Sequence, residues 1–285
     1  FSIGYEHESV PEEQGGWQIV GPSANAFGPL DKPRELTVDE IHAIVDQFRD
    51  AAWRAYDIGF DAVEIHAAHG YLLSQFLDPL INEREDEYGG SFDNRIRILV
   101  EVVDAVRSVI PDTMPVLVRV SATDWAAGGW DLDQTVDLAK VLKKHGVDLM
   151  DVSTGGMIPG VTIPVKPDYQ VPFAEQVRSR AEIPTTAVGL ITKPKQAKKI
   201  LKSGAADAIE IGRAALRDRM ASSRRPQARY SDRRCALPAA VCAWRILNAT
   251  NNQGNIEQQS NNNNAPCTAL AVAGALLFGA RCRLK

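Results

Sequence analysis

The strongest constraint on the fold is an alternation of short apolar strands with helical periodicity along the chain as far as Asp218. Strand-like stretches occur at residues 62–66, 116–120, 149–153, 185–188 and 208–211, which makes five βα units. Strands that alternate with helices predict an α/β protein with a parallel sheet. A complete eight-unit barrel usually needs about 250 residues, so this body is too short for one. The pattern alone is also compatible with a doubly wound open sheet.

The 285-residue chain divides into three segments on composition and periodicity. Residues 1–35 are rich in Gly, Pro and polar residues, which predicts an N-terminal loop segment. Residues 36–218 carry the βα units. Residues 219–285 lose the period and contain an Asn/Gln-rich run at 248–264, which predicts a low-complexity, disordered tail.

Two helix starts carry residues that suit the capping position. Thr37 is followed three residues later by Glu40, the spacing of a capping box at the start of the first helix. Thr192 is the predicted N-cap of the helix around residues 196–201, and Gly204 is its predicted end.

The net charge bears on the partners of this protein, and its cysteine usage bears on the cellular compartment. The net charge of −4 gives no general reason to expect nucleic acid or an acidic membrane as partner, although the tail from Arg219 holds ten Lys/Arg and two Asp/Glu residues. All four cysteines lie in that tail, so no disulfide framework holds the body, which favours a reducing, cytoplasmic compartment. The longest apolar run, residues 265–280, is too short and interrupted for a membrane span. We therefore expect a soluble protein.

The candidate site begins at the end of the first strand. Glu64 and His66 are two residues apart and point to the same side of that strand, and His69 and Tyr71 follow just beyond it. The H-x-x-H pair allows a metal site, but a catalytic zinc needs a third protein ligand. Buried structural histidines are a second alternative. Two imidazoles and a phenol at one strand end favour a third, hydrogen-bond donors that polarise a substrate oxygen beside an acid.

The last two strands end in glycines that suit an anion site. Gly189 and Gly212 each lie where a strand gives way to a loop or helix, and Arg213 follows the second. Glycine permits close backbone approach, a helix N-terminus offers free N–H groups, and a guanidinium suits bidentate phosphate contact. These residues predict phosphate binding.

Arg119 lies inside the apolar strand at residues 116–120, where a cation is costly to bury without a partner. One interpretation is a salt bridge to a buried carboxylate such as Glu64. The other is contact with an electron-rich cofactor.

Together these motifs resemble the old yellow enzyme family of flavin-dependent ene-reductases, in particular its bacterial-type branch. The resemblance spans roughly residues 15–218. Its motifs include Glu64-Ile-His-Ala-Ala-His-Gly-Tyr-Leu, Asn82-x-Arg-x-Asp-x-Tyr-Gly-Gly-Ser, Asn94-Arg95, Val118-Arg-Val-Ser, Ala187-Val-Gly-Leu-Ile and Ile211-Gly-Arg.

The resemblance implies a (β/α)₈ TIM barrel that holds FMN at its C-terminal mouth, so residues 36–218 are expected to form a partial FMN-binding barrel. It implies that His66 and His69 bind the substrate oxygen and that Tyr71 donates the proton. Arg119 would lie against the flavin. Gly189, Gly212 and Arg213 would hold the FMN phosphate, and no metal is expected.

The implied function is an FMN-dependent oxidoreductase that uses NADPH or NADH to reduce the C=C bond of an enone or nitroalkene. Its partner is then a small molecule, and a homo-oligomer is compatible with the family. Aligned on these motifs, the chain lacks the first three strands of the family's barrel. The alternative is therefore a non-catalytic partial barrel with weak or no FMN binding.

Overall fold

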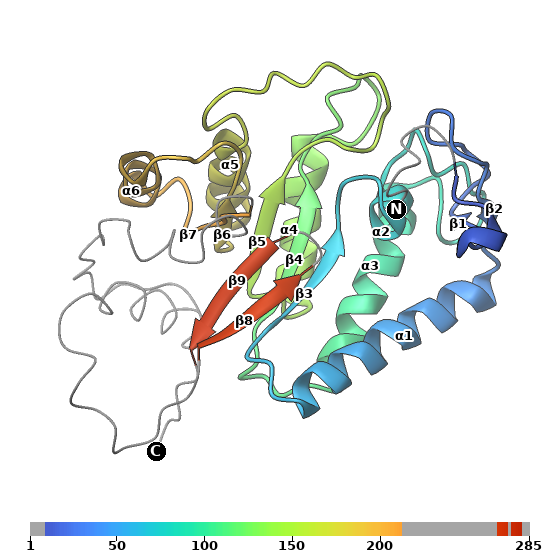
Figure 1. The fold of residues 1–285 in the computed structure, drawn as a ribbon, viewed down its shortest axis with the longest axis horizontal. Helices are drawn as coiled ribbons and strands as arrows, with labels where there is room; N and C mark the ends of the chain where they lie inside the picture. Colours follow the sequence, from blue (N-terminus) through green and yellow to red (C-terminus); the bar gives the residue numbers. More distant parts are fainter. Residues whose placement is uncertain (1–8, 213–266, 273–274, 281–285) are drawn as a thin grey trace.

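Five parallel strands form the central sheet in the computed structural model of this chain (Figure 1). The structure describes residues 9–212, 267–272 and 275–280. The strands are β3 (Val63–Ala67), β4 (Val116–Ser121), β5 (Leu149–Ser153), β6 (Thr185–Ala187) and β7 (Ala208–Ile209). They are the five strands that the sequence predicts, and only the last two end earlier than predicted, by one and two residues.

A helix precedes the first strand, and one or more helices connect each successive pair of strands. These elements are α1 (Val38–Asp57), the short α2 (Leu72–Leu77), α3 (Phe92–Arg107), α4 (Leu132–Lys144), α5 (Val171–Ala181) and α6 (Pro194–Ser203). Figure 1 shows them following one another around the sheet, from α1 and α3 beside β3 to α5 and α6 beside β6 and β7.

The strand order decides between the two architectures that the sequence left open. It runs β3-β4-β5-β6-β7 without a reversal. Right-handed crossovers that all proceed in one direction place their helices on one side of the sheet. A doubly wound sheet instead reverses direction at a switch point and has helices on both faces. The described strands therefore have the organisation of a barrel segment, as the sequence led us to expect.

The two faces of the sheet differ in chemistry because side chains alternate along each strand. One face carries Ile65, Val118 and Val152, which join the hydrophobic core under the helices. The register pairs His66 with Arg119 and Arg119 with Asp151, so these three side chains share the opposite face. The apolar core thus lies between sheet and helices, and the other face is largely polar.

An ion pair across the polar face shows that the sheet is curved. Arg119 on β4 donates from Nη1 to Oε1 of Glu210, just after β7, at 2.6 Å. The two strands are three positions apart, roughly 14 Å in a flat sheet. Side chains stand about perpendicular to a sheet, so this contact requires a concave polar face like the interior of a barrel. We call this surface the concave face.

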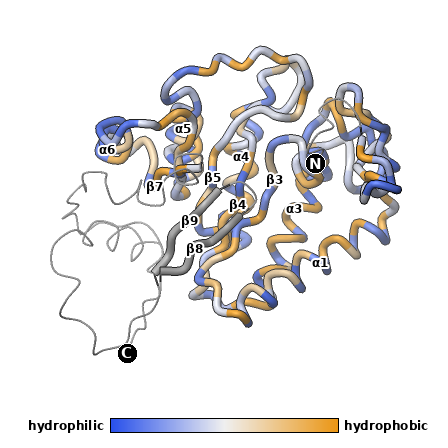
Figure 2. Tube along the Cα trace, viewed as in Figure 1, coloured by the Kyte–Doolittle hydropathy of each residue, from blue (hydrophilic) through white to orange (hydrophobic). Residues whose placement is uncertain are grey.

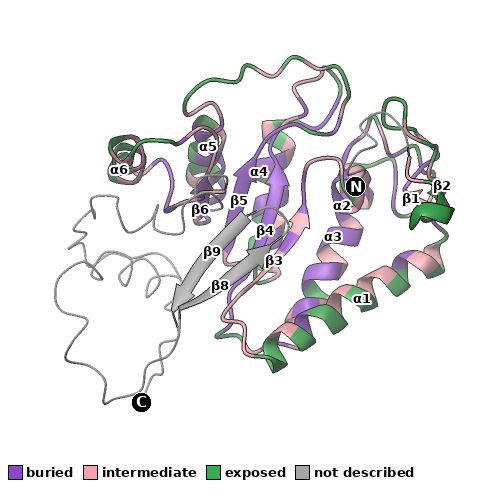
Figure 3. Ribbon diagram, in the orientation of Figure 1, coloured by how far each residue is buried: buried purple, intermediate pink, exposed green. Residues whose placement is uncertain are grey.

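Helix α1 illustrates how the outer layer forms. The backbone N–H of Glu40 donates to Oγ1 of Thr37 at 3.3 Å, and the N–H of Thr37 donates to Glu40 Oε2 at 2.9 Å. The predicted capping box is therefore confirmed. Hydrophobic and hydrophilic residues alternate along this helix (Figure 2), and exposed positions alternate with half-buried ones (Figure 3), while Ile41 and Ala52 are its buried residues. β4 and β5 are buried throughout.

The predicted start of α6 is wrong by one residue. The N-cap is Lys193 rather than Thr192. The side chain of Gln196 satisfies the free backbone donors instead, because its Oε1 accepts from the N–H of Thr192 at 2.9 Å and of Lys193 at 3.3 Å. The predicted end is confirmed, since Gly204 terminates the helix at φ 77°.

The long loop at residues 79–91 is held by its own polar side chains. Nδ2 of Asn82 donates to the carbonyls of Phe76 and Tyr88, both at 2.7 Å. Arg84 pairs with Asp86 and donates to the carbonyl of Leu36 at 2.7 Å. The motif Asn82-x-Arg-x-Asp-x-Tyr-Gly-Gly-Ser is therefore a structural brace in this fold.

The two ends of the chain add small pieces of regular structure. Near the N-terminus a 3₁₀ turn (Glu12–Gln14) precedes a short parallel pair, β1 (Val20–Gly21) with β2 (Arg34–Glu35). Near the C-terminus β8 (Cys267–Val272) and β9 (Ala275–Ala280) form an antiparallel hairpin. The rest of the tail that we predict to be disordered lies outside the described residues. Among those that are described, no helix has the length and apolarity to cross a membrane.

Candidate functional site

Backbone strain marks the edge of the sheet where the strands end. Four non-glycine residues with positive φ follow successive strands: His69 (60°) after β3, Trp125 (60°) after β4, Asp168 (66°) after β5 and Leu190 (52°) after β6. Such conformations cost roughly 1–3 kcal/mol each and cluster at functional sites. The carboxyl edge of the sheet is therefore the candidate site, as expected for a barrel.

His66 and Tyr71 meet at this edge. Their ring centroids are 5.2 Å apart with an interplanar angle of 90°. His66 Nδ1 accepts the backbone N–H of Ala68 at 3.3 Å, which places the proton of the neutral ring on Nε2. No hydrogen bond to that Nε2 is found among the described residues. The ring thus offers one N–H donor to a ligand.

His69 is held in place from two neighbouring strands. Its backbone N–H donates to Oγ of Ser121, at the end of β4, at 3.0 Å. Its Nε2 lies 2.7 Å from Oγ of Ser153, at the end of β5. Its ring centroid is 5.5 Å from that of His66. The structure therefore brings His66, His69 and Tyr71 together as predicted, but it engages one nitrogen of His69 with a serine.

Two glycines allow this close arrangement. A Cβ at Gly70 would lie 2.4 Å from the carbonyl oxygen of Gly156, and one at Gly156 would lie 2.8 Å from Cα of His69. Both residues also have positive φ. The turn after β3 and the loop after β5 can touch only because neither position has a side chain.

The electrostatic environment keeps the three side chains uncharged at neutral pH. Burial lowers the pKa of His66, and the positive charge of Arg119 lowers it further. The same two causes lower the pKa of His69 to about 4. Burial raises the pKa of Tyr71. Two neutral imidazoles and a protonated phenol can donate hydrogen bonds, and the phenol can give up a proton.

Arg119 lies on the concave face with His66, and its partners differ from the predicted one. It pairs with Glu210 at 2.6 Å and with Asp151 at 3.4 Å. The predicted salt bridge to a buried carboxylate is therefore present, but Glu210 and Asp151 form it in place of Glu64, whose two carboxyl oxygens have no hydrogen-bond partner among the described residues. Burial, followed by the charges of Asp151 and Glu210, raises the pKa of Glu64 well above its usual range.

One end of Arg119 remains available to a ligand. Its Nε is buried and has no hydrogen-bond partner within the part of the chain that the structure describes. A buried, unpaired donor on a cation is costly unless an acceptor approaches it. This orphaned donor fits an electron-rich cofactor ring, which is the functional interpretation of Arg119.

The predicted phosphate residues are only partly described. Gly189 follows β6 at φ 105°, and a Cβ there would lie 3.0 Å from Nε2 of Gln170. Gln170 also accepts from Ser153 at 3.3 Å, so one side chain links Gly189 to the support of His69. Gly212 is half-buried shortly after β7, and Arg213 lies outside the described residues.

Sequence reasoning missed four polar residues that support the site: Ser121, Ser153, Asp151 and Glu210. A signal was present in β5, where Asp151 and Ser153 alternate with buried Met150 and Val152. Polar residues at every second position of a buried strand indicate a polar face.

The alternative metal site at His66 and His69 can also be compared with the structure, because both histidines lie among the described residues. In the described part of the chain no group of three or more His, Cys, Asp or Glu residues is arranged to hold a metal ion. His66 and His69 already use one nitrogen each for protein contacts. The histidine pair is thus better suited to hydrogen bonding than to ligation.

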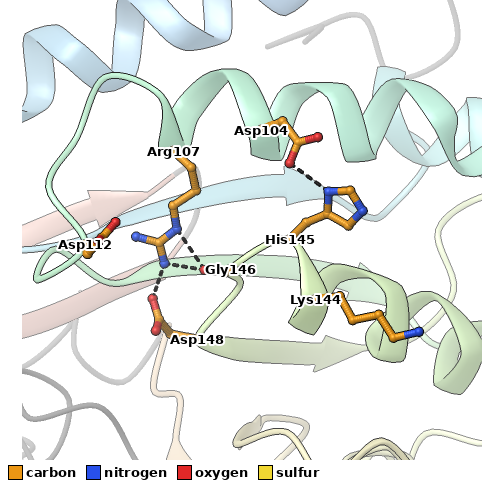
Figure 4. A pocket seen from close by; sticks show the side chains of 7 residues that line it. All are labelled: Asp104, Arg107, Asp112, Lys144, His145, Gly146 and Asp148. Atoms are coloured by element: carbon orange, nitrogen blue, oxygen red, sulfur yellow. Dashed lines mark hydrogen bonds and ion pairs between the residues drawn. The ribbon is translucent and has the colours of Figure 1, made fainter.

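A separate recess of about 490 Å³ lies at the opposite end of the strands (Figure 4). Its charged lining is largely paired within the protein. His145 contacts Asp104 at 2.7 Å, and Arg107 binds Asp148 and the carbonyl of Gly146. At that edge of a barrel such contacts serve stability, so we do not assign it the chemistry.

Comparison with known proteins gives a consistent picture. Residues 6–231 match the NADH:flavin oxidoreductase / NADH oxidase family. Over 202 residues the chain is 52% identical to an NADPH dehydrogenase of Listeria monocytogenes, covering 70% of this chain and 59% of the relative. Over 220 residues it is 47% identical to an NADH:flavin oxidoreductase of Gibberella zeae, covering 71% of this chain and 53% of that protein. The chain thus spans a little over half the length of these relatives.

Solved structures show the same fold. The old yellow enzyme homologue from Zymomonas mobilis aligns with a TM-score of 0.60 and 31% identity, covering 73% of this chain and 60% of its own. Morphinone reductase in complex with tetrahydroNAD aligns with a TM-score of 0.58 and 32% identity, covering 71% and 57%. Both relate the five strands of the central sheet to a longer barrel.

Proposed function

The chain belongs to the NADH:flavin oxidoreductase / NADH oxidase family, and from this we propose that it is an FMN-dependent oxidoreductase. It uses NADPH or NADH to reduce the C=C bond of an α,β-unsaturated carbonyl or nitro compound. The observation that carries the proposal is the meeting of His66, Tyr71 and an Arg119 with an orphaned donor at one strand edge.

Two groups of residues would hold FMN, one at each end of the cofactor. Arg119 Nε would donate to the electron-rich ring, and Gly189 would let the backbone approach the phosphate. Gly212 and Arg213 would complete the phosphate contact, as their sequence suggests. Bound FMN supplies the hydride that the protein's own side chains cannot.

His66 and His69 would hold the substrate oxygen. A neutral imidazole donates an N–H without carrying a charge of its own, and its donation strengthens as the oxygen gains negative charge. The lowered pKa of both rings keeps this state at neutral pH. The two residues would therefore orient the substrate, and His66, whose Nε2–H has no partner among the described residues, would carry most of the stabilisation of the enolate-like charge that develops.

Tyr71 would complete the reduction. Hydride addition at the β-carbon leaves the α-carbon in need of a proton, and the phenol is the acid beside the substrate oxygen site. Its raised pKa keeps it protonated at physiological pH, and its exposure of 44% allows recharging from solvent. Breaking the O–H bond places the proton on carbon and a transient charge on the phenolate.

The NADPH-dependent consumption of 2-cyclohexenone by the FMN-loaded chain tests this proposal, with cyclohexanone as the matched control. The enone should be consumed with stoichiometric NADPH oxidation to give cyclohexanone, and the saturated ketone should not react. Oxidation of NADPH at the same rate with and without enone would contradict the C=C reduction.

The second candidate is a non-catalytic partial barrel with weak or no FMN binding. It is favoured by the two unpaired sheet edges, since β3 and β7 each have one neighbour among the described strands. Its signature would be a folded chain that takes up no FMN and oxidises no NADPH.

The expected partner, cellular compartment and oligomeric state accompany the same proposal. The partner would be a small molecule, and the absence of cysteine from residues 36–218 suits the reducing cytoplasm. A homo-oligomer is compatible with this family, and sedimentation of the purified chain would report it.

A further inference from the structure

The concave face holds an unbalanced cluster of charges. Three carboxyl groups surround one guanidinium: Glu64 from β3, Asp151 from β5 and Glu210 after β7 around Arg119 of β4. Asp151 also accepts the hydroxyl of Thr186 at 2.5 Å. Asp151 is therefore shared, whereas the 2.6 Å contact to Glu210 is the strongest hold on Arg119.

Glu210 lies between the two predicted ends of the cofactor. It binds Arg119, the residue expected at the flavin ring, and it precedes Gly212, expected at the phosphate, by two residues. Because it holds Nη1, the orientation of the whole planar guanidinium is set, including the unpaired Nε. A short side chain at position 210 would leave Arg119 free to turn toward Asp151 or Glu64.

We propose that Glu210 is a positioning residue that fixes Arg119 across the concave face, so that the free donor of the guanidinium faces the ring of a bound flavin. This inference rests on the proposed function, because it takes a flavin as the ligand at this edge. It assigns a role to a residue that reaches the cofactor only through Arg119.

The charge of the pair also depends on pH. Burial, and then the neighbouring Asp151, raises the pKa of Glu210 to about 8. Glu64, Asp151 and Arg119 are the charged groups that face it, with neutral His66 beside them. Below pH 8 the protonated carboxyl of Glu210 leaves Asp151, at 3.4 Å, as the main offset to the positive charge of Arg119. Above it the carboxylate neutralises that charge, so affinity for an electron-rich ring should fall as pH rises.

Flavin titrations of the full chain test the proposal with three variants. Glu210→Ala removes the contact, whereas Glu210→Gln keeps an acceptor for Arg119 but not the charge. Asp207→Asn is the matched control, because Asp207 pairs with Arg178 at 2.8 Å in the same segment without touching Arg119. FMN and riboflavin are the two probes, since riboflavin has the ring and lacks the phosphate.

We expect Glu210→Ala to raise the Kd of both flavins by roughly tenfold or more, the usual effect of a lost hydrogen bond to a charged group. Glu210→Gln should recover most of this loss and give a Kd that no longer changes between pH 7 and 9. Unchanged binding by Glu210→Ala would overturn the proposal. So would a loss confined to FMN, which would place the effect at the phosphate, or an equal loss in Asp207→Asn.

Unfolding without any flavin separates this inference from the proposed function. At pH 9, where the Glu210 carboxyl is ionised, Glu210→Leu removes the 2.6 Å partner of Arg119 and should lower the melting temperature more than the double variant Arg119→Met/Glu210→Leu does, with the single variant Arg119→Met completing the cycle. Additive effects would overturn the ion-pair role whether or not flavin binds. A wild-type chain that binds neither flavin but shows this coupling would contradict the proposed function alone.

Discussion

His66→Ala should slow enone reduction far more than His69→Ala does. The two histidines differ in whether the ring Nε2 is available to hydrogen-bond a ligand. Nδ1 of His66 accepts a backbone N–H, which leaves its Nε2–H for a ligand, whereas Nε2 of His69 is engaged by Ser153 at 2.7 Å. The first ring can therefore direct its only donor at the substrate oxygen. The second would have to use its other nitrogen or leave the serine.

The expected magnitudes follow from this difference. Removing one donor that faces a developing oxyanion typically costs roughly 10²–10³ in rate, and we expect that loss for His66→Ala. His69→Ala removes one neutral hydrogen bond to Ser153, worth about 1 kcal/mol. We therefore expect a loss smaller by roughly tenfold or more.

Stopped-flow absorbance separates the steps. Reduction of bound FMN by NADPH should proceed in both variants at close to the wild-type rate, because it involves no substrate oxygen. Re-oxidation of the reduced enzyme by 2-cyclohexenone should be slowed much more in His66→Ala than in His69→Ala. A larger defect in His69→Ala, or equal slowing of both steps in His66→Ala, would refute the reasoning.

Three further results are expected. Tyr71→Phe should slow re-oxidation by enone without affecting reduction by NADPH, whereas equal rates in both forms would exclude Tyr71 as the proton donor. Burial, and then the charge of Asp78, raises the pKa of Asp124 to about 8. The free energy of unfolding should therefore fall by up to about 1.4 kcal/mol per pH unit as pH rises from 4 to 8. Asp124→Asn, measured by urea denaturation, should flatten that dependence. Thr37→Ala should cost about 1 kcal/mol in the same assay through loss of the α1 cap, and no change would show that Glu40 caps the helix alone.

Local sequence patterns predicted the elements of the fold well. The strands β4 and β5 begin where their apolar runs begin, and Thr37 with Glu40 forms the expected cap. These features depend on residues that are adjacent or one turn apart. The predicted cap of α6 was wrong although it too is local. The side chain of Gln196 accepts the free backbone N–H groups there, in place of the hydroxyl of Thr192.

Long-range contacts were predicted less well. His66 and Tyr71 could be brought together from one strand end, but the partner of Arg119 could not. Glu210 lies 91 residues away, and it reaches Arg119 only because the sheet is curved. The alternation along β5 already indicates that Asp151 and Ser153 share one face, but no local pattern encodes the curvature that makes this face concave around Arg119.

The most direct test of the account is one anaerobic spectral titration of the full chain. Added FMN should bind and give a flavin absorption band, which NADPH should bleach and an equimolar amount of 2-cyclohexenone should restore. A folded chain whose FMN remains free, or whose reduced flavin is not re-oxidised by the enone, would contradict the assignment of this strand edge as the site of a flavin oxidoreductase.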